Sequence, residues 1–117
     1  MAVSELRVAI ARQLSEGRQP SISDVARRLG LSSRTLQRQL GAYGTNYQRQ
    51  LASVRHTIAR RLLANTDLDA IAIALLLGFA EPNSFARAFR SWERTTPQRW
   101  RDRHTEQSLS ATKDIGL

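Results

Sequence analysis

One short pattern of apolar residues and glycine occurs twice in this chain, and it restricts the fold more than any other feature. The segment 25–31, VARRLGL, matches 73–79, IALLLGF, at an offset of 48 residues. Beyond each glycine, 36–40, LQRQL, matches 85–89, FARAF, at an offset of 49. Apolar residues three and four apart indicate helices, and glycine ends a helix because it accepts the left-handed backbone of a tight turn. The sequence therefore predicts two copies of one helix-turn-helix unit.

The first copy, residues 21–40, carries clear helix-capping signals. Ser21 and Asp24 form a Ser-x-x-acid pattern, and Ser32 stands just before the second helix. Both patterns are typical of helix N-termini. Apolar residues of the second helix face the core, so its outward positions are Arg34, Thr35, Gln37 and Arg38. Because the second helix of such a motif lies in the DNA major groove, where these side chains can bond base edges, the pattern predicts DNA binding.

Further helices are expected on both sides of the two copies. A first helix is predicted over 4–16, a long helix without glycine or proline over 46–64, and a short helix over 96–100 whose Trp100 folds back onto the domain. The residues expected to start helices are Ser4, Thr45, Asp69 and Pro82. The long helix is expected to turn Tyr47, Leu51, Val54, Ile58 and Leu62 toward the core, with Leu63 as a further candidate.

The predicted fold is all-α, with two helix-turn-helix subdomains joined by a long linker helix and about seven helices in all. The expected divisions are 1–44 for the N-terminal helix and first motif, and 45–65 for the linker helix. The second motif and the closing helix follow over 66–103. From 104 to 117 the sequence is polar and without period, which favours a disordered tail.

Basic residues are concentrated in the middle of the chain. The formal net charge is +8, and all but one of the 18 basic residues are arginine. No acidic residue lies between Asp24 and Asp67, a segment that contains Arg27, Arg28, Arg34, Arg38, Arg49, Arg55, Arg60 and Arg61. A folded segment of one charge repels itself unless a polyanion lies against it, so nucleic acid is the favoured partner over a merely solvated surface.

Several function classes lack their usual signals in this sequence. There is no cysteine for a disulfide or a thiolate metal site, and the only histidines are His56 and His104. No glycine-rich phosphate loop follows a strand, so we expect neither an enzyme nor a cofactor. No apolar run reaches the ~20 residues of a membrane span, and the N-terminus lacks the order of a signal peptide. A soluble cytoplasmic protein at the nucleoid is expected.

The two copies together resemble the DNA-binding domain of the AraC/XylS-type bacterial transcription regulators. The most specific stretch is 77–92, LGFAEPNSFARAFRSW, which Pro97 and Trp100 follow. The stretch 29–38, LGLSSRTLQR, and the pair Gly44-Thr45 before a helix with Arg55 extend the resemblance to roughly residues 4–103. The resemblance implies transcription regulation by sequence-specific binding of double-stranded DNA, with two recognition helices in adjacent major-groove turns.

The predicted linker helix has a length that fits this arrangement. Its 19 residues would span roughly 28 Å at about 1.5 Å per residue. Successive major-groove turns lie about 34 Å apart. With the widths of the motifs added, two reading helices could reach neighbouring turns.

Two groups of DNA-contacting residues are expected. The base-reading candidates are Arg34, Gln37, Arg38, Asn83 and Arg87. The phosphate-contact candidates are Ser32, Ser33, Thr35, Ser84, Arg90 and Arg55. For Arg55, in the middle of the linker helix, bracing between helices is an equally open interpretation.

The chain departs from the family pattern at three places. Arg94 stands where the family usually has glycine, and Ala72 stands where it usually has an acidic residue. The segment 71–77, IAIALLL, is apolar on every face, and such a helix must be buried all round or contact a partner. Our hypothesis is that Ile71, Leu75 and Leu76 dock an effector-binding or dimerisation domain of a longer protein.

Two alternative functions compete with the regulator interpretation. Arginine charge alone would suit a non-specific architectural DNA-binding protein, which would bind any duplex with similar affinity. The apolar helix over 71–77 would suit a protein-interaction module.

Overall fold

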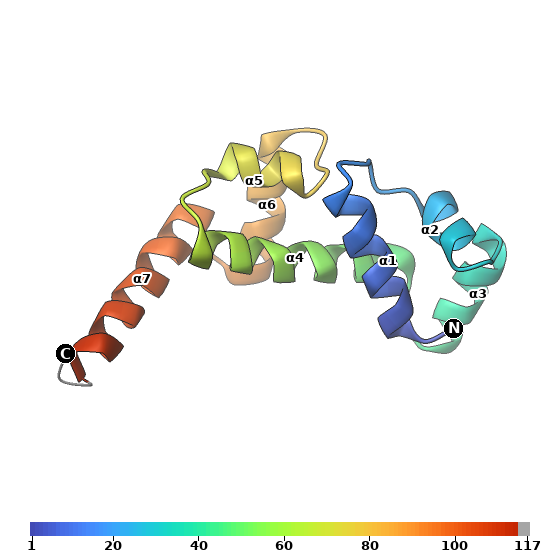
Figure 1. The fold of residues 1–117 in the computed structure, drawn as a ribbon, viewed down its shortest axis with the longest axis horizontal. Helices are drawn as coiled ribbons and strands as arrows, with labels where there is room; N and C mark the ends of the chain where they lie inside the picture. The colour runs from blue at the N-terminus through green and yellow to red at the C-terminus, as the bar shows by residue number, and fades with distance from the viewer. Residues whose placement is uncertain (115–117) are drawn as a thin grey trace. The chain divides into compact units, whose positions relative to one another are not determined.

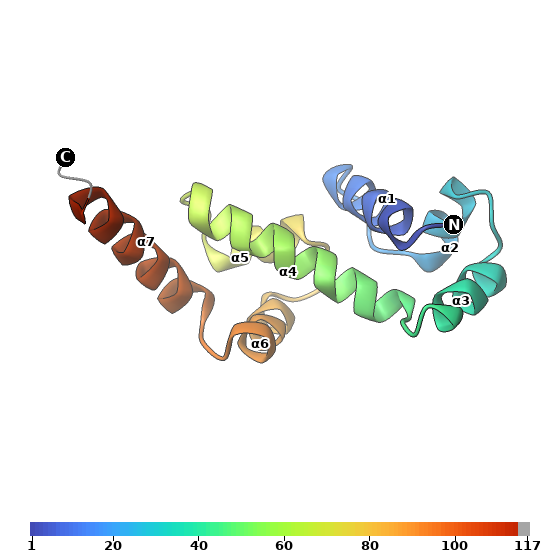
Figure 2. The ribbon, with the colours of Figure 1, turned by 90° about the horizontal axis from the view of Figure 1, so that it is seen from below.

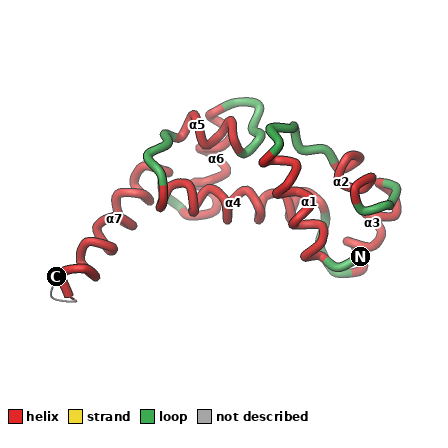
Figure 3. Tube along the Cα trace, viewed as in Figure 1, coloured by secondary structure: helices red, strands yellow, loops and turns green. Residues whose placement is uncertain are grey.

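Seven α-helices, and no β-strand, make up the part of the chain that this computed structural model describes (Figures 1 and 3). The structure describes the backbone of residues 1–114 and the side chains of residues 1–105. The helices are α1 (Val3–Ser15), α2 (Ile22–Arg28), α3 (Ser33–Ala42), α4 (Tyr47–Asn65), α5 (Ala70–Leu76), α6 (Pro82–Glu93) and α7 (Pro97–Asp114). The predicted all-α fold is confirmed. None of the described helices combines the length and the apolar character needed to cross a membrane.

The chain divides into two compact units. Unit 1 comprises residues 1–57 and 76–78, and unit 2 comprises residues 58–75 and those from 79 onward. The division falls inside α4, so this helix contributes residues to both units.

Unit 1 is built around α1, α2 and α3. In it α1 packs on α2, and α2 packs on α3. Its buried apolar residues are Leu6, Ala9, Ile10, Leu14, Val25, Ala26, Leu36, Leu40, Tyr47, Leu51, Val54 and Leu77. The one buried polar residue among those described is Gln13, whose side-chain oxygen accepts a hydrogen bond from the Ser21 backbone N–H at 3.2 Å. This bond fixes the start of α2 against the end of α1.

Two of the predicted helix starts in unit 1 are confirmed and two are wrong. The Ser21 and Ser32 hydroxyls cap α2 and α3 by accepting backbone N–H bonds. Ser4 does not cap α1, because the helix begins earlier, at Val3, with Ala2 in the capping position. Asn46 replaces Thr45 at the start of α4, since its side-chain oxygen reaches the Arg49 N–H at 2.9 Å.

The buried face of α4 changes along its length. Tyr47, Leu51 and Val54 are buried as predicted, and they belong to unit 1. Farther along, the buried residues are Ala59 and Leu63 of unit 2, so the prediction is confirmed at Leu63, whereas Ile58 and Leu62 are only half-buried. The apolar residues do not form one continuous stripe along α4, because its two parts contribute to the cores of different units.

Unit 2 has an aromatic core between α6 and α7. The ring of Phe89 contacts Phe85, Trp92 and Trp100 edge to face, with centroids 5.9, 6.3 and 6.2 Å apart. Trp100 also stacks on His104 at 5.0 Å, and the Arg60 guanidinium lies 5.4 Å from its ring centroid. The prediction that Trp100 folds back onto the domain is confirmed.

The last helix is longer than the sequence suggested. Two views show α6 leading through a short turn into α7 (Figures 1 and 2). The backbone of α7 continues to Asp114, whereas a short helix over 96–100 and a disordered tail from 104 were expected. No glycine or proline after Pro97 interrupts the helix, although its apolar pattern has faded. Residues 115–117 of the expected tail lie outside the described residues.

Candidate nucleic-acid interface

The sequence repeat corresponds to a structural repeat. Helices α2 and α5 cover equivalent residues at the offset of 48, and α3 and α6 begin at equivalent residues at the offset of 49. Gly30 and Gly78 occupy the left-handed region, with φ of 72° and 75°. After them, the N–H groups of Leu31 and Phe79 bond to the carbonyl oxygens of the equivalent alanines at 2.9 and 3.0 Å. Both copies therefore form the same helix-turn-helix.

The caps of the first helix in each copy are also equivalent. The Ser21 hydroxyl accepts a bond from the Asp24 N–H at 3.3 Å, and the Asp69 carboxylate accepts one from the Ala72 N–H at 2.8 Å. The predicted cap at Asp69 is confirmed. Asp69 supplies the negative charge at the start of α5 that Ala72 does not.

The outer face of α3 presents the residues predicted to read bases. Leu36 and Leu40 are fully buried, which turns the opposite face of the helix to solvent. Arg34, Gln37 and Arg38 are exposed there. Within the described residues no hydrogen bond or ion pair engages these three side chains, so their donors are available to a ligand.

The N-terminus of α3 is a cluster of hydroxyl groups. Ser32 accepts a bond from the Thr35 N–H at 3.1 Å and donates its own hydroxyl proton to the Thr35 side chain at 3.0 Å. The Ser33 hydroxyl bonds that of Ser23 at 3.3 Å. All three predicted phosphate contacts in this copy thus lie together at one helix end.

The outer face of α6 presents the second set. Phe85 and Phe89 are fully buried, and Asn83, Arg87 and Arg90 are exposed. The Arg87 guanidinium lies 3.5 Å from the half-buried Ser84 hydroxyl. The predicted residues of the second copy therefore share one helix.

Position 81, at the start of α6, was not among the DNA-contacting residues predicted from the sequence. Glu81 occupies the capping position with extended backbone, but its side chain makes no capping bond. Pro82 is in the first turn of α6, as predicted. The repeat could have indicated this position, because the offset of 49 pairs Glu81 with Ser32, a predicted DNA-contacting residue.

Arg55 is the one predicted phosphate contact that the structure places elsewhere. Its Nε donates to the Leu77 carbonyl oxygen at 2.8 Å and its Nη2 to that of Gly78 at 2.9 Å. Burial lowers the pKa of the Arg55 guanidinium. These contacts lie within unit 1 and correspond to the bracing interpretation, because the donors hold the backbone that ends α5.

Carboxylates outside the basic segment pair with three of its arginines. Arg27 lies 3.5 Å from Asp24 on α2, and Arg60 lies 3.5 Å from Glu93 in unit 2. Arg28 bonds both carboxylate oxygens of Glu16. This hydrogen bond, ahead of the opposing effect of desolvation, lowers the pKa of Glu16. The free positive charge is consequently smaller than the sequence suggested, while Arg34 and Arg38 keep theirs.

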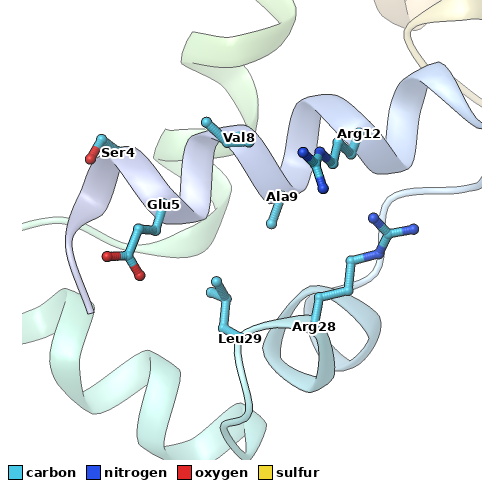
Figure 4. Close-up of a pocket in the computed structure, with 7 residues that line it drawn as sticks. All are labelled: Ser4, Glu5, Val8, Ala9, Arg12, Arg28 and Leu29. Carbon is cyan, nitrogen blue, oxygen red and sulfur yellow. The ribbon is translucent and has the colours of Figure 1, made fainter.

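A shallow groove of about 390 Å³ lies between α1 and the end of α2 (Figure 4). Its lining is mainly apolar, with Arg12 and Arg28 on one side and Glu5 on the other. The lining residues are Ser4, Glu5, Val8, Ala9, Arg12, Arg28 and Leu29. None of them belongs to the predicted DNA-contacting sets.

Helix α5 has a buried side and an exposed apolar side. Ile73 and Ala74 are buried, whereas Ile71, Leu75 and Leu76 expose 58%, 67% and 52% of their surface. The structure therefore agrees with the condition set by the docking hypothesis, which required these three residues to lie outside the core.

Comparisons with known proteins place the chain in a family. The helix-turn-helix domain family matches residues 25–103. The ornithine utilization regulator of Pseudomonas aeruginosa is 42% identical over 83 residues, which are 71% of this chain and 24% of that protein. The chain belongs to the AraC-type helix-turn-helix family. It spans about a quarter of the length of the curated relatives that it matches.

Two solved structures have the same fold. A Chromobacterium violaceum regulator with an AraC-type DNA-binding domain is 28% identical, with a TM-score of 0.69 over 86% of this chain and 94% of that one. The DNA-binding domain of AdpA, solved in complex with a target DNA, is 25% identical, with a TM-score of 0.73 over 87% and 94%. The AraC-type resemblance predicted from the sequence is thus confirmed.

Proposed function

We propose that this chain regulates transcription by binding specific double-stranded DNA sites, with α3 and α6 as reading helices in adjacent major-groove turns. The observation that carries the proposal is the structural repeat, in which each second helix buries its apolar face and exposes side chains that carry hydrogen-bond donors. Membership of a family of transcription regulators supports it. The role is one of binding, without catalysis, at the nucleoid of a bacterial cytoplasm.

The reading chemistry follows from the exposed side chains. The guanidinium forks of Arg34, Arg38 and Arg87 match the O6 and N7 acceptors of guanine. The amides of Gln37 and Asn83 match the N6 and N7 atoms of adenine. Each good bidentate pair is worth about 1–3 kcal/mol of discrimination against the wrong base.

Phosphate contacts would supply sequence-independent affinity and orient the helices. Ser32, Ser33 and Thr35 surround the N-terminus of α3, where backbone N–H groups favour an anion. Ser84 and Arg90 would act in the second copy. We assign no phosphate contact to Arg55, because backbone carbonyl groups engage two of its nitrogens.

Selection of duplexes from a random pool at moderate salt tests the proposal. We expect two short preferred boxes about one helical turn apart. Gln37→Ala should relax one box and Arg87→Ala the other. Gln48→Ala and Arg61→Ala are matched controls, because they remove an exposed glutamine and an exposed arginine from α4 and should leave both boxes intact.

Three results would contradict this proposal. A pool without preference would support the non-specific architectural alternative. If Gln37→Ala and Arg87→Ala weakened the base preference in the same box, the result would exclude separate reading helices. An effect of Arg61→Ala equal to that of Arg87→Ala would mean that general charge, and not base contact, determines the outcome.

We further propose that the exposed apolar side of α5 docks a companion domain of a longer regulator. The length of the relatives and the exposure of Ile71, Leu75 and Leu76 support this assignment. In a longer natural protein that contains this domain, α5 amides should exchange more slowly with solvent than in the isolated chain. Equal exchange rates would argue against docking at α5.

A further inference from the structure

We propose that Glu81 determines specificity in the second motif by accepting a hydrogen bond from the exocyclic amino group of a cytosine. This inference rests on the proposed DNA-binding function and extends it to one base pair. It also predicts that the two boxes differ in chemistry, because no carboxylate stands on the reading face of the first motif.

The position of Glu81 is that of a base-reading residue. The N-terminal residues of a recognition helix contact base edges, and Glu81 immediately precedes α6 with φ of −136° and ψ of 142°. Its side chain is exposed. Asn83 and Arg87, the predicted readers, lie two and six positions farther along.

The carboxylate of Glu81 is not used by its own helix. A residue in this position normally turns its side chain back to a backbone N–H, as Ser32 does with Thr35 in the first copy. Glu81 makes no such bond, and only its backbone carbonyl engages the helix, by accepting from the Ser84 N–H at 3.1 Å. Pro82 removes one further N–H from this end. Within the described residues no hydrogen bond or ion pair engages the Glu81 side chain, so its acceptor oxygens are available to a ligand.

The hydrogen-bonding groups of DNA restrict which base the Glu81 carboxylate can bind. A carboxylate beside a phosphate is repelled, so Glu81 is favourable at the interface only where it meets a donor. In the major groove the donors are the N4 amino group of cytosine and the N6 amino group of adenine. An ionised carboxylate only accepts, and adenine also presents the N7 acceptor beside its amino group, which would face the carboxylate unfavourably. Cytosine is therefore the preferred base.

The repeat shows what the two motifs share and where they differ. At the offset of 49, Arg38 pairs with Arg87, so both boxes should contain a guanine. Glu81 instead pairs with Ser32, whose hydroxyl is occupied in capping α3. The two motifs consequently read different sequences although they have the same fold.

The test compares duplexes selected by the wild-type chain, Glu81→Gln and Asp67→Asn. The control Asp67→Asn removes the same charge from an exposed residue that stands outside the reading helices. The wild type should show a preference for cytosine at one position of the second box. Glu81→Gln should shift that position toward adenine, with a change of roughly tenfold in relative affinity, because an amide both donates and accepts. Glu81→Ala should lose the preference, and Asp67→Asn should keep it.

Other outcomes separate this inference from the proposed function. A wild-type pool without boxes would overturn both. Two clear boxes that stay unchanged in Glu81→Gln would overturn the role of Glu81 alone. Glu81→Gln could also bind every duplex more tightly by the same factor, with unchanged base preferences. That result would mean that Glu81 only repels phosphate, and it too would overturn the inference. Circular dichroism would verify that each variant is folded.

Discussion

Gly30 and Gly78 occupy equivalent positions in the two motifs. Replacing each by alanine measures how much the close packing around Gly78 adds to the cost of a side chain there. Both have φ near +70°, a conformation that costs about 1–2 kcal/mol for a residue with a Cβ atom. Alanine also restricts the unfolded chain, which raises the free energy of unfolding by about 0.4–1 kcal/mol. These two terms apply equally to Gly30→Ala and Gly78→Ala, so we expect a shared loss of about 1 kcal/mol.

The surroundings of the two glycines differ. A Cβ atom on Gly30 would meet nothing within 4 Å. A Cβ atom on Gly78 would lie 2.8 Å from Cδ and 3.2 Å from Cγ of Pro20, and 3.2 Å from Cδ2 of Leu14. Overpacking of this kind costs about 1–3 kcal/mol. Gly78→Ala should therefore lower the free energy of unfolding by about 2–4 kcal/mol, against about 1 kcal/mol for Gly30→Ala.

The assay is urea denaturation followed by far-UV circular dichroism, combined with amide exchange at Leu36 and Leu40 in the core of unit 1. Both glycines belong to unit 1, so the two variants perturb the same cooperative unit. Pro20→Ala in the Gly78→Ala background removes the ring atoms that the new Cβ meets, and it should recover much of the difference. If the two alanine variants agree within about 0.5 kcal/mol, the close approach of Gly78 to Pro20 is wrong.

Three further predictions concern stability. The Tyr47 hydroxyl is buried without a hydrogen-bond partner among the described residues. Tyr47→Phe should therefore raise the free energy of unfolding, measured by urea denaturation, by about 1 kcal/mol or more. A lower free energy of unfolding in this variant would mean that the hydroxyl has a partner. Arg94 ends α6 with φ of 59°, and Arg94→Gly should stabilise the chain by about 0.5–1 kcal/mol, seen as a higher melting temperature. The lowered pKa of Glu16 means that its bond to Arg28 contributes stability above the unfolded-state pKa and loses it as the pH falls through the folded-state pKa. The denaturation midpoints of wild type and Glu16→Gln should therefore differ at neutral pH and converge in acid.

The sequence predicted the features that repeat and the features that are local. The offsets of 48 and 49 located both motifs, because the same apolar residues must be buried in each copy. The caps at Ser21, Ser32 and Asp69 were predictable, since each bond spans only three residues. Long-range contacts were beyond such reasoning.

Arg55 and Gly78 illustrate those long-range contacts. The sequence places Arg55 in a basic segment, which suggests a phosphate contact, while the structure gives it two carbonyl partners 22 and 23 residues away. Gly78 has the same sequence role as Gly30, yet Pro20 approaches it from a distant part of the chain. Neither partner can be inferred from spacing, because only the packed unit brings them together.

Local rules are broken at both ends of α6. Glu81 takes a capping position without capping, and Arg94 takes a left-handed conformation that glycine would adopt without strain. The equivalent start of α3 follows the usual rule, so the fold itself does not require an uncapped residue there. Natural sequences depart from such rules mainly at functional sites. The uncapped carboxylate is therefore better explained by what α6 contacts than by what stabilises it, and Glu81→Ser should stabilise the chain while removing the cytosine preference.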